Sequence, residues 1–412
     1  MSHSAEPGSS PLNVSIVAAL RDASWFDHRR LDAYSRILFG FEVIVFIFFV
    51  LGTHGMIVPL DKPTSTDFVS FYAAGLLTAQ GHAADVYIRA RHAAAEELAL
   101  GVKGAGYNYF FYPPTYLLIC QFLPRLPYLL SFVVWESLTG AAYLWVMRSI
   151  LPPGRPLLPF LAFPAVLWNI GFGQNALLSA ALLGGGLLQL ERRPWLAGVL
   201  FGCMCYKPHL ALLIPVALAA GRHGRAFAAA GLTAACLGGL TLLLYGPETW
   251  HNFLTLSASG TGGTFATAQI PYSGMISPYA ALRKLGAANG PALAGQGLVV
   301  LGMVVAVIVT WRSKASMPAR AMVLIAATLL SPPVMLIYDL SLATVVMAWA
   351  WRDAASGGKG EGFLPWEKAG YALVFLIAMV SRSFAFSGPV LLGPLAGLVL
   401  LMLGMMRARR KI

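Results

Sequence analysis

The chain has 412 residues, of which 58% are hydrophobic and only 11% are charged, and its formal net charge is +12. About a quarter of the residues of a soluble domain are charged, so this composition excludes an ordinary soluble protein and indicates a membrane protein. The basic residues form short clusters between apolar runs and not one patch, which argues against nucleic acid as a partner.

The first 35 residues are rich in Ser and Pro and then become basic, and the apolar run that follows is too long for the core of a signal peptide. We therefore expect a retained cytoplasmic tail over 1–35. Its stretch 14–36 is mildly amphipathic. It predicts either a weak interfacial helix or a disordered segment that leads into the first membrane crossing.

Apolar runs of about 17 to 24 residues predict an all-α transmembrane domain over 36–406, followed by a basic cytoplasmic tail over 407–412. We expect about twelve crossings, near 37–58, 127–147, 156–171, 174–190, 194–206, 208–220, 226–245, 293–311, 320–336, 338–351, 369–386 and 389–406. With both termini cytoplasmic, most Lys and Arg fall on the inner side. This orientation requires the apolar stretch 113–123 to enter the membrane without crossing it.

Two long loops fall on the predicted outer side. The first, 59–112, contains two amphipathic helical stretches, 67–79 and 84–100, and the second, 246–290, is rich in Gly, Ser and Thr around 257–267 and is a candidate lid. Short polar turns at 171–175, 206–209 and 331–339 fall on the same side. They either surround one polar site or are ordinary hairpins between helices.

Two charged residues at this side are candidates for chemistry. Asp67 opens a helical stretch just after the first crossing, where its carboxylate is either a general base or a helix N-cap. Lys207 lies in a polar break between apolar runs, and a lysine at that depth needs a partner unless it snorkels to the headgroups. A lipid phosphate is a natural partner, to which His209 would also donate, although a lone histidine at a helix end is often structural.

Polar side chains in the other turns are candidates for binding. Gln174 and Asn175 suit hydroxyl-rich ligands or would cap a hairpin, and Asp339, beside Tyr338, would orient Lys207, bind a hydroxyl or cap a helix. Motifs for nucleotide or metal binding are not apparent in the sequence, and the four cysteines read as packing residues. We therefore expect neither a metal nor a cofactor.

Taken in order, several short motifs resemble glycosyltransferase family 87, which includes polyprenyl-phosphate-mannose-dependent alpha-1,2-mannosyltransferases. They are Asp67-Phe-Val-Ser-Phe-Tyr-Ala-Ala74, Tyr109-Phe-Phe-Tyr-Pro-Pro114, Gly173-Gln-Asn175, Tyr206-Lys-Pro208 and Leu330-Ser-Pro-Pro333. The resemblance implies a GT-C fold, a polyprenyl-phosphate sugar donor, inversion without a metal, and a catalytic aspartate in the first outer loop, which is Asp67. One departure is that the segment after the Ser-Pro element lacks the expected histidine, so Tyr338 or Asp339 would replace it.

The sequence thus predicts a bacterial inner-membrane glycosyltransferase whose site faces the periplasm and which moves a hexose, mannose by resemblance, to a lipid or glycan acceptor. Lys207 and His209 are expected at the donor phosphate. Residues expected to bind the sugar or acceptor are Gln174, Asn175, Tyr72, Tyr112, Tyr338 and Asp339. A polytopic transporter or flippase is the alternative, although such folds usually contain internal repeats and none is evident.

Overall fold

The computed structural model describes residues 11–52, 67–104, 106–259, 272–356 and 362–410, and within these ranges its regular elements are helices. The first part of the chain forms α1 Pro11–Asp22, α2 His28–Gly52, α3 Phe68–Ala79, η1 Ala83–Tyr87, α4 Arg89–Leu100, α5 Pro114–Cys120, η2 Leu123–Arg125 and α6 Tyr128–Ile150. The middle part forms α7 Leu158–Leu161, α8 Pro164–Phe172, α9 Ala176–Gln189, α10 Pro194–Cys203, η3 Met204–Tyr206, α11 Pro208–Ala211, α12 Ile214–Ala220 and α13 Gly224–Ser259. The last part forms η5 Tyr272–Gly274, α15 Pro278–Lys284, α16 Asn289–Arg312, α17 Met317–Leu330, η6 Ile337–Ser341, α18 Leu342–Ala355, α19 Glu367–Ser387 and α20 Gly393–Arg409.

Four of the described helices, α6, α13, α16 and α19, are long and apolar enough to cross a membrane, and several shorter apolar helices accompany them. A helix that crosses the hydrocarbon core needs about 20 residues. The expectation of an all-helical fold is therefore confirmed for the described residues, and four of their helices could cross a membrane. The count of twelve crossings, their orientation and the GT-C architecture remain predictions.

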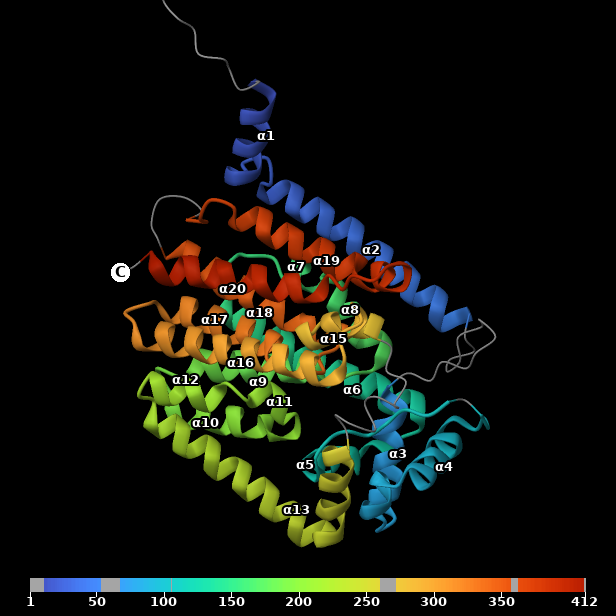
Figure 1. The fold of residues 1–412 in the computed structure, drawn as a ribbon. Helices are drawn as coiled ribbons and strands as arrows, with labels where there is room; N and C mark the ends of the chain where they lie inside the picture. The colour runs from blue at the N-terminus through green and yellow to red at the C-terminus, as the bar shows by residue number, and fades with distance from the viewer. Residues whose placement is uncertain (1–10, 53–66, 105, 260–271, 357–361, 411–412) are drawn as a thin grey trace, which may run out of the picture.

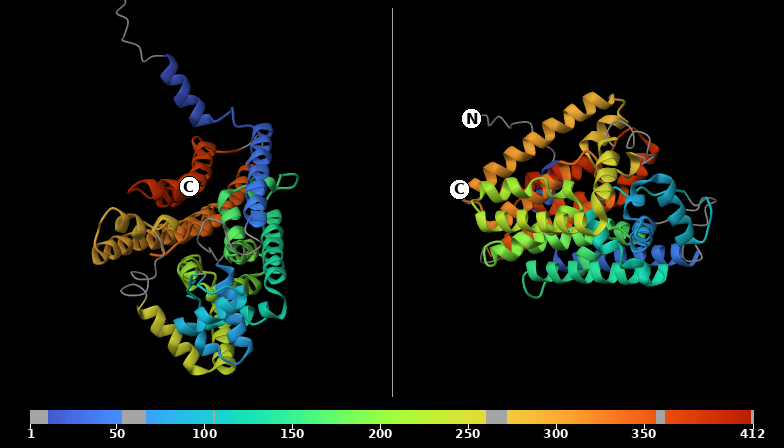
Figure 2. Two further views of the ribbon diagram at one scale, coloured as in Figure 1. Left: turned by 90° about the vertical axis from the view of Figure 1, so that its right-hand side faces the viewer. Right: turned by 90° about the horizontal axis from the view of Figure 1, so that it is seen from below.

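The helices stack into a layered bundle (Figure 1), in which α2, α19 and α20 lie on one side and α13 on the opposite side. Between them, α17 and α18 are buried around nearly their whole circumference, as expected for apolar helices at the centre of a bundle. Helices α3, α4 and α5 gather at one end of the bundle (Figures 1 and 2). This end is the predicted outer end.

Proline and glycine explain where the expected crossings differ from the observed helices. The run 156–171 divides into α7 and α8, and Pro164, which has no backbone N–H, begins the second helix. The run expected to end at 245 continues through a kink at Gly246 (φ 79°, ψ 166°) to Ser259. Of the candidate lid, 246–290, residues 260–271 lie outside the described residues.

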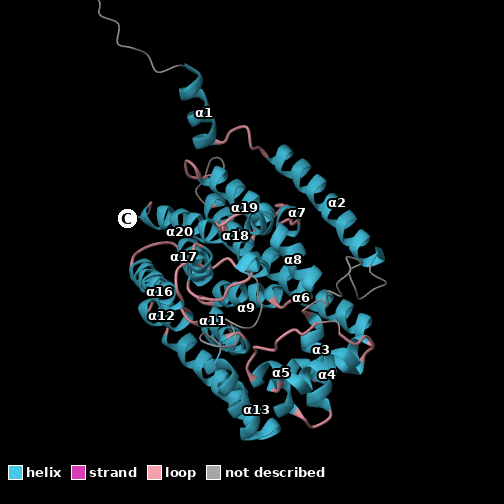
Figure 3. Cartoon of the chain, turned by 45° about the vertical axis from the view of Figure 1, so that its right-hand side comes forward, coloured by secondary structure: helices cyan, strands magenta, loops and turns pink. Residues whose placement is uncertain are grey.

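The N-terminal part and the first outer loop follow the expectations more closely. Helix α2 begins at His28, earlier than expected, because the Asp27 carboxylate accepts the Arg30 backbone N–H at 2.8 Å and so caps it. The two outer-loop helices are present as α3 and α4. Helix α5 (Figure 3) has seven residues and spans about 10 Å, which is too short to cross a membrane. That the stretch 113–123 enters the membrane remains a prediction.

A buried pair of ionisable side chains holds α4 against α3. His92 Nε2 lies 3.1 Å from the Ser70 carbonyl, and Glu96 Oε2 accepts the Asn108 backbone N–H at 3.0 Å. Burial lowers the pKa of His92 to about 4 and raises the pKa of Glu96 to about 8. Both side chains are therefore neutral near pH 7.

At the other end of the bundle a buried arginine joins the last three helices. The Arg407 guanidinium on α20 donates to Asp353 of α18 at 2.7 Å and to Glu367 of α19 at 2.6 Å. Its side chain is fully buried. Because an unpaired charge is costly there, this contact specifies how α18, α19 and α20 pack.

Candidate active site

Asp67 stands at the N-cap position of α3, but its side chain makes no capping hydrogen bond. Its Oδ2 instead accepts a hydrogen bond of 2.8 Å from Gln174 Nε2, which lies in the turn between α8 and α9. The side chain is partly buried. The carboxylate is thus directed across the molecule and not back onto its own helix.

Gly173 makes this approach possible. Its φ is +68°, which favours glycine, and a Cβ atom there would lie 2.5 Å from the Cβ of Phe68, the residue after Asp67. Asn169 completes the turn, since its carbonyl accepts the Gln174 N–H at 3.0 Å and its side chain accepts the Ala176 N–H at 2.8 Å. The turn therefore presents Gln174 to the start of α3.

The amide of Gln174 has a defined orientation. The Tyr112 hydroxyl donates to Gln174 Oε1 at 3.1 Å, so the amide NH₂ is the group that faces Asp67. The Tyr112 ring is fixed by an edge contact with Phe71 and a tilted contact with Tyr116, at centroid distances of 5.3 and 4.7 Å. An aromatic layer thus supports the carboxylate and its amide partner.

Lys207 is buried, with 3% of its side chain exposed, between η3 and α11. Its ammonium donates to Asp339 Oδ1 at 2.5 Å and to Asn175 Oδ1 at 3.1 Å, and it lies 5.3 Å from the centre of the Tyr338 ring. Asp339 also accepts the Leu336 N–H at 3.4 Å, so it caps η6 as well as pairing with the lysine. The partner that burial requires is therefore a carboxylate of the chain, and the lysine does not snorkel.

These contacts form one connected group, which we call the polar cluster: Asp67, Tyr112, Gln174, Asn175, Lys207 and Asp339. Its two halves meet where the Asn175 backbone N–H donates to Gln174 Oε1 at 3.3 Å. The Asn175 Nδ2 is buried and has no hydrogen-bond acceptor among the described residues. A buried amide donor without an acceptor is uncommon, and it suits a site that receives a hydroxyl or phosphate oxygen.

Three further residues predicted to bind the substrates lie outside the polar cluster. Tyr338 is buried beside the polar cluster and its ring centre is 6.2 Å from that of Phe172. The Tyr72 hydroxyl donates to the Leu126 carbonyl at 3.0 Å, which directs it into the packing below α3. His209 is exposed on α11. It takes no part in the hydrogen bonds of Lys207, whose acceptors are Asn175 and Asp339.

Arg382, which no motif singles out in the sequence, also lies near the polar cluster. The guanidinium, on α19, lies 4.8 Å from the ring centre of Trp168 and 5.3 Å from that of Phe172. Both rings belong to α8, directly before the turn that carries Gln174. No motif marks this arginine, because it reaches the site through helix packing.

The surroundings of Asp67 set its acidity. Burial raises its pKa above the ordinary value, while the Gln174 hydrogen bond and the positive charges of Arg382 and Lys207 act in the opposite direction. A carboxyl group with a raised pKa and one fixed donor is suited to accept a proton. Among the residues that the structure describes, none of the His, Cys, Asp and Glu side chains group as a metal site.

Comparison with known proteins gives one match. The model of glycosyltransferase family 87 matches residues 110–338, more than half of the chain. The matched region contains Tyr112, Gln174, Asn175 and Lys207 of the polar cluster, whereas Asp67 precedes it. No curated protein and no solved structure matches the chain.

Proposed function

Since this chain belongs to glycosyltransferase family 87, we propose that it transfers a hexose, mannose in the first instance, from a polyprenyl-phosphate carrier to a lipid or glycan acceptor at the periplasmic face of the bacterial inner membrane. The observation that carries the proposal is the 2.8 Å hydrogen bond from Gln174 to Asp67. It supports a carboxylate held for a substrate, because the same side chain at a helix start would otherwise cap that helix.

Asp67 acts as the general base. It takes the proton of the acceptor hydroxyl, whose oxygen attacks the anomeric carbon from the face opposite the phosphate while the bond from that carbon to the phosphate oxygen breaks. One displacement inverts the anomeric configuration, and the polyprenyl phosphate leaves with the bonding electrons. The phosphate is a good leaving group, so the site needs cations to receive it more than it needs an acid.

Lys207 and Arg382 face the departing phosphate, with His209 as a further donor. A phosphate monoester carries between one and two negative charges near neutral pH. Asp339 already balances Lys207, so the lysine alone leaves most of that charge uncompensated. Arg382 supplies the second cation, and its stacking on Trp168 and Phe172 holds it beside the Gln174 turn.

The sugar hydroxyls are bound by amide and phenol groups of the polar cluster. The buried Asn175 Nδ2 is a donor for one of them. Tyr112 and Tyr338 contact Gln174 and Lys207 of the polar cluster, so we place both at the sugar. Tyr72, whose hydroxyl donates to the Leu126 carbonyl, is not part of this set. Gln174 both orients Asp67 and limits the room beside it.

The test is transfer of label from radiolabelled polyprenyl-phosphate mannose in membranes that contain matched amounts of wild type or Asp67→Asn. We expect the variant to lose about 100-fold or more of the rate, since a positioned base contributes about 10²–10⁴-fold. Asp85→Asn, in the same loop, should keep the wild-type rate. An equally active Asp67→Asn would remove Asp67 as the base. Movement of labelled donor across vesicles without product would favour a transporter instead.

A second experiment tests the phosphate role. Arg382→Gln should raise the donor KM about tenfold or more and leave the acceptor KM nearly unchanged, and Arg382→Lys should recover part of the loss. Arg125→Gln is the matched control, because this arginine also stacks on a ring, that of Phe122, at 4.5 Å. Equal donor KM values for the two Gln variants would exclude Arg382 from the donor site.

A further inference from the structure

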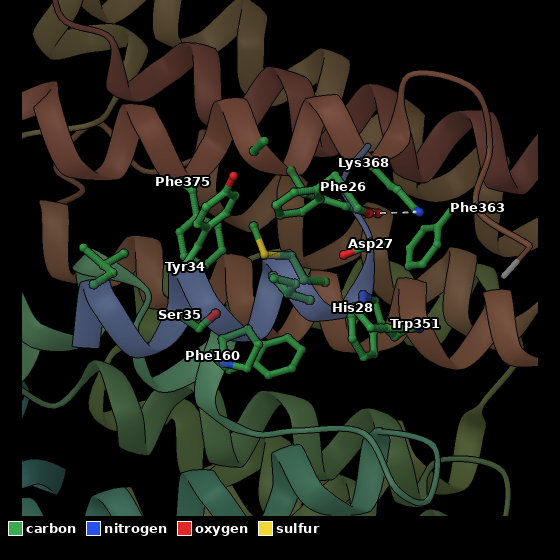
Figure 4. Close-up of a pocket in the computed structure, with 16 residues that line it drawn as sticks. Phe26, Asp27, His28, Tyr34, Ser35, Phe160, Trp351, Phe363, Lys368 and Phe375 are labelled. Carbon is green, nitrogen blue, oxygen red and sulfur yellow. Dashed lines mark hydrogen bonds between the residues drawn. The ribbon is translucent and has the colours of Figure 1, made fainter. Parts of the chain in front are cut away.

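A cavity of about 240 Å³ lies between α2, α7, α18 and α19, away from the polar cluster (Figure 4). The length of helix α6 gives the distance between the polar cluster and the cavity. It starts beside Phe68, whose ring is 5.5 Å from that of Tyr128, and it ends where Arg352 of α18 donates to the Ile150 carbonyl at 3.4 Å. Its 23 residues span about 34 Å. The cavity therefore lies about one bilayer thickness from Asp67, at the predicted cytoplasmic end.

The walls of the cavity are mostly apolar and aromatic. Phe160, Trp351 and Phe375 line it (Figure 4), and Leu31 and Leu38 of α2 are also among the lining residues. An engineered apolar cavity of about 150 Å³ stays free of water and binds small hydrocarbons. A larger, partly open cavity of this kind at a membrane surface suits a hydrocarbon chain.

Cations mark one edge of the cavity. The Lys368 ammonium lines it and donates to the Phe26 carbonyl at 3.3 Å. The Arg155 guanidinium contacts two lining residues, His28 through a hydrogen bond of 2.5 Å and the Trp351 ring at 5.2 Å. Two basic side chains beside an apolar slot match a ligand with an anionic head and a hydrocarbon tail.

The start of α2 carries two acids beside its basic residues. Asp27, which lines the cavity, accepts the backbone N–H of Arg30 at 2.8 Å, and Asp32 pairs with the Arg36 guanidinium at 2.8 Å. Together with Arg29, this helix start therefore adds more positive than negative charge.

We propose that this cavity is a specific site for one anionic phospholipid of the inner leaflet, with an acyl chain among Phe160, Trp351 and Phe375 and the phosphate beside Lys368 and Arg155. The site is separate from the sugar-transfer site. It would fix the N-terminal part of α2 to α18 and α19 by filling the space between them.

Native mass spectrometry of the delipidated full-length protein tests the site, with palmitoyl-oleoyl phosphatidylglycerol or phosphatidylcholine added at equal concentration. We expect one phosphatidylglycerol per chain, bound about tenfold or more tightly than phosphatidylcholine. Ala372→Trp, which fills the cavity, should abolish that binding. Its control is Leu373→Trp, on the exposed face of the same helix, which should bind as wild type does.

Lys368→Gln keeps the cavity and should reduce the preference for phosphatidylglycerol to about that for phosphatidylcholine. It also covers the case in which Ala372→Trp fails to give a monodisperse protein. Equal binding of the two lipids by wild type, equal binding by the two Trp variants, or an unchanged preference in Lys368→Gln would each overturn the proposal. Because the readout is lipid retention, failure of the proposed sugar transfer would not affect it.

Discussion

The pair of Lys207 and Asp339 permits a quantitative test of how the polar cluster holds together. Both side chains are 3% exposed and their charged atoms are 2.5 Å apart. Lys207→Met leaves the carboxylate with only a backbone N–H, and Asp339→Asn leaves the ammonium with only neutral acceptors. Removing one partner of a buried ion pair costs about 3–5 kcal/mol, whereas replacing both is often nearly neutral.

The cycle of two single variants and the double variant isolates this coupling. We expect each single variant to lose about 3 kcal/mol or more of unfolding free energy and the double variant to lose less than either. The assay is unfolding in mixed micelles followed by the fluorescence of the 10 tryptophans, with Lys103→Met, an exposed lysine, as control. If the loss in the double variant equals the sum of the single losses, the two charges are not coupled and the reasoning fails.

Three further predictions concern the scaffold. Gly173→Ala should lose about 2 kcal/mol or more of unfolding free energy and most of the transfer activity, since a left-handed φ alone costs a non-glycine residue about 1–2 kcal/mol. Gly171→Ala, where the added methyl group would lie in open space, should change neither quantity. The pKa of Glu96 is raised from 4.5 to about 8, so this group makes the folded state hold more protons than the unfolded state between about pH 4.5 and 8. Below pH 6.5 the lowered pKa of His92 acts in the opposite direction. Hydrogen exchange should therefore show α4 becoming less protected between pH 6.5 and 8 in wild type but not in Glu96→Gln. Arg407→Met should lower the unfolding free energy by about 3 kcal/mol or more because two buried carboxylates lose their cation, whereas the exposed Arg409→Met should leave it unchanged in the same micelle assay.

Apolar run length predicted the long helices well. The run expected at 293–311 is α16, Asn289–Arg312, and the run expected at 369–386 is α19, Glu367–Ser387. The length of an apolar run gave the wrong helix bounds where the backbone changes direction inside the run, as at Pro164 and Gly246. Hydropathy reports the environment of a segment and not its direction, so it cannot detect these breaks.

The order of the motifs predicted most residues of the polar cluster. Gln174, Asn175 and Lys207 lie in turns that the charge pattern assigns to one side, and the structure places them in contact. Their partners could not be assigned from sequence, because each contact depends on how helices pack. Arg382 is the clearest case, since it lies far along the chain and approaches α8 only from the side of α19.

The spacing of Lys207 and Asp339 along the chain has a consequence for biogenesis. The aspartate is synthesised 132 residues after the lysine, which at about 5–20 residues per second is a delay of about 7 to 26 s. During that interval the lysine lacks its counter-ion and is stable only in water or at the headgroups. We therefore expect the helices around η3 to reach their final depth late, only after η6 has been synthesised and has brought the carboxylate to them.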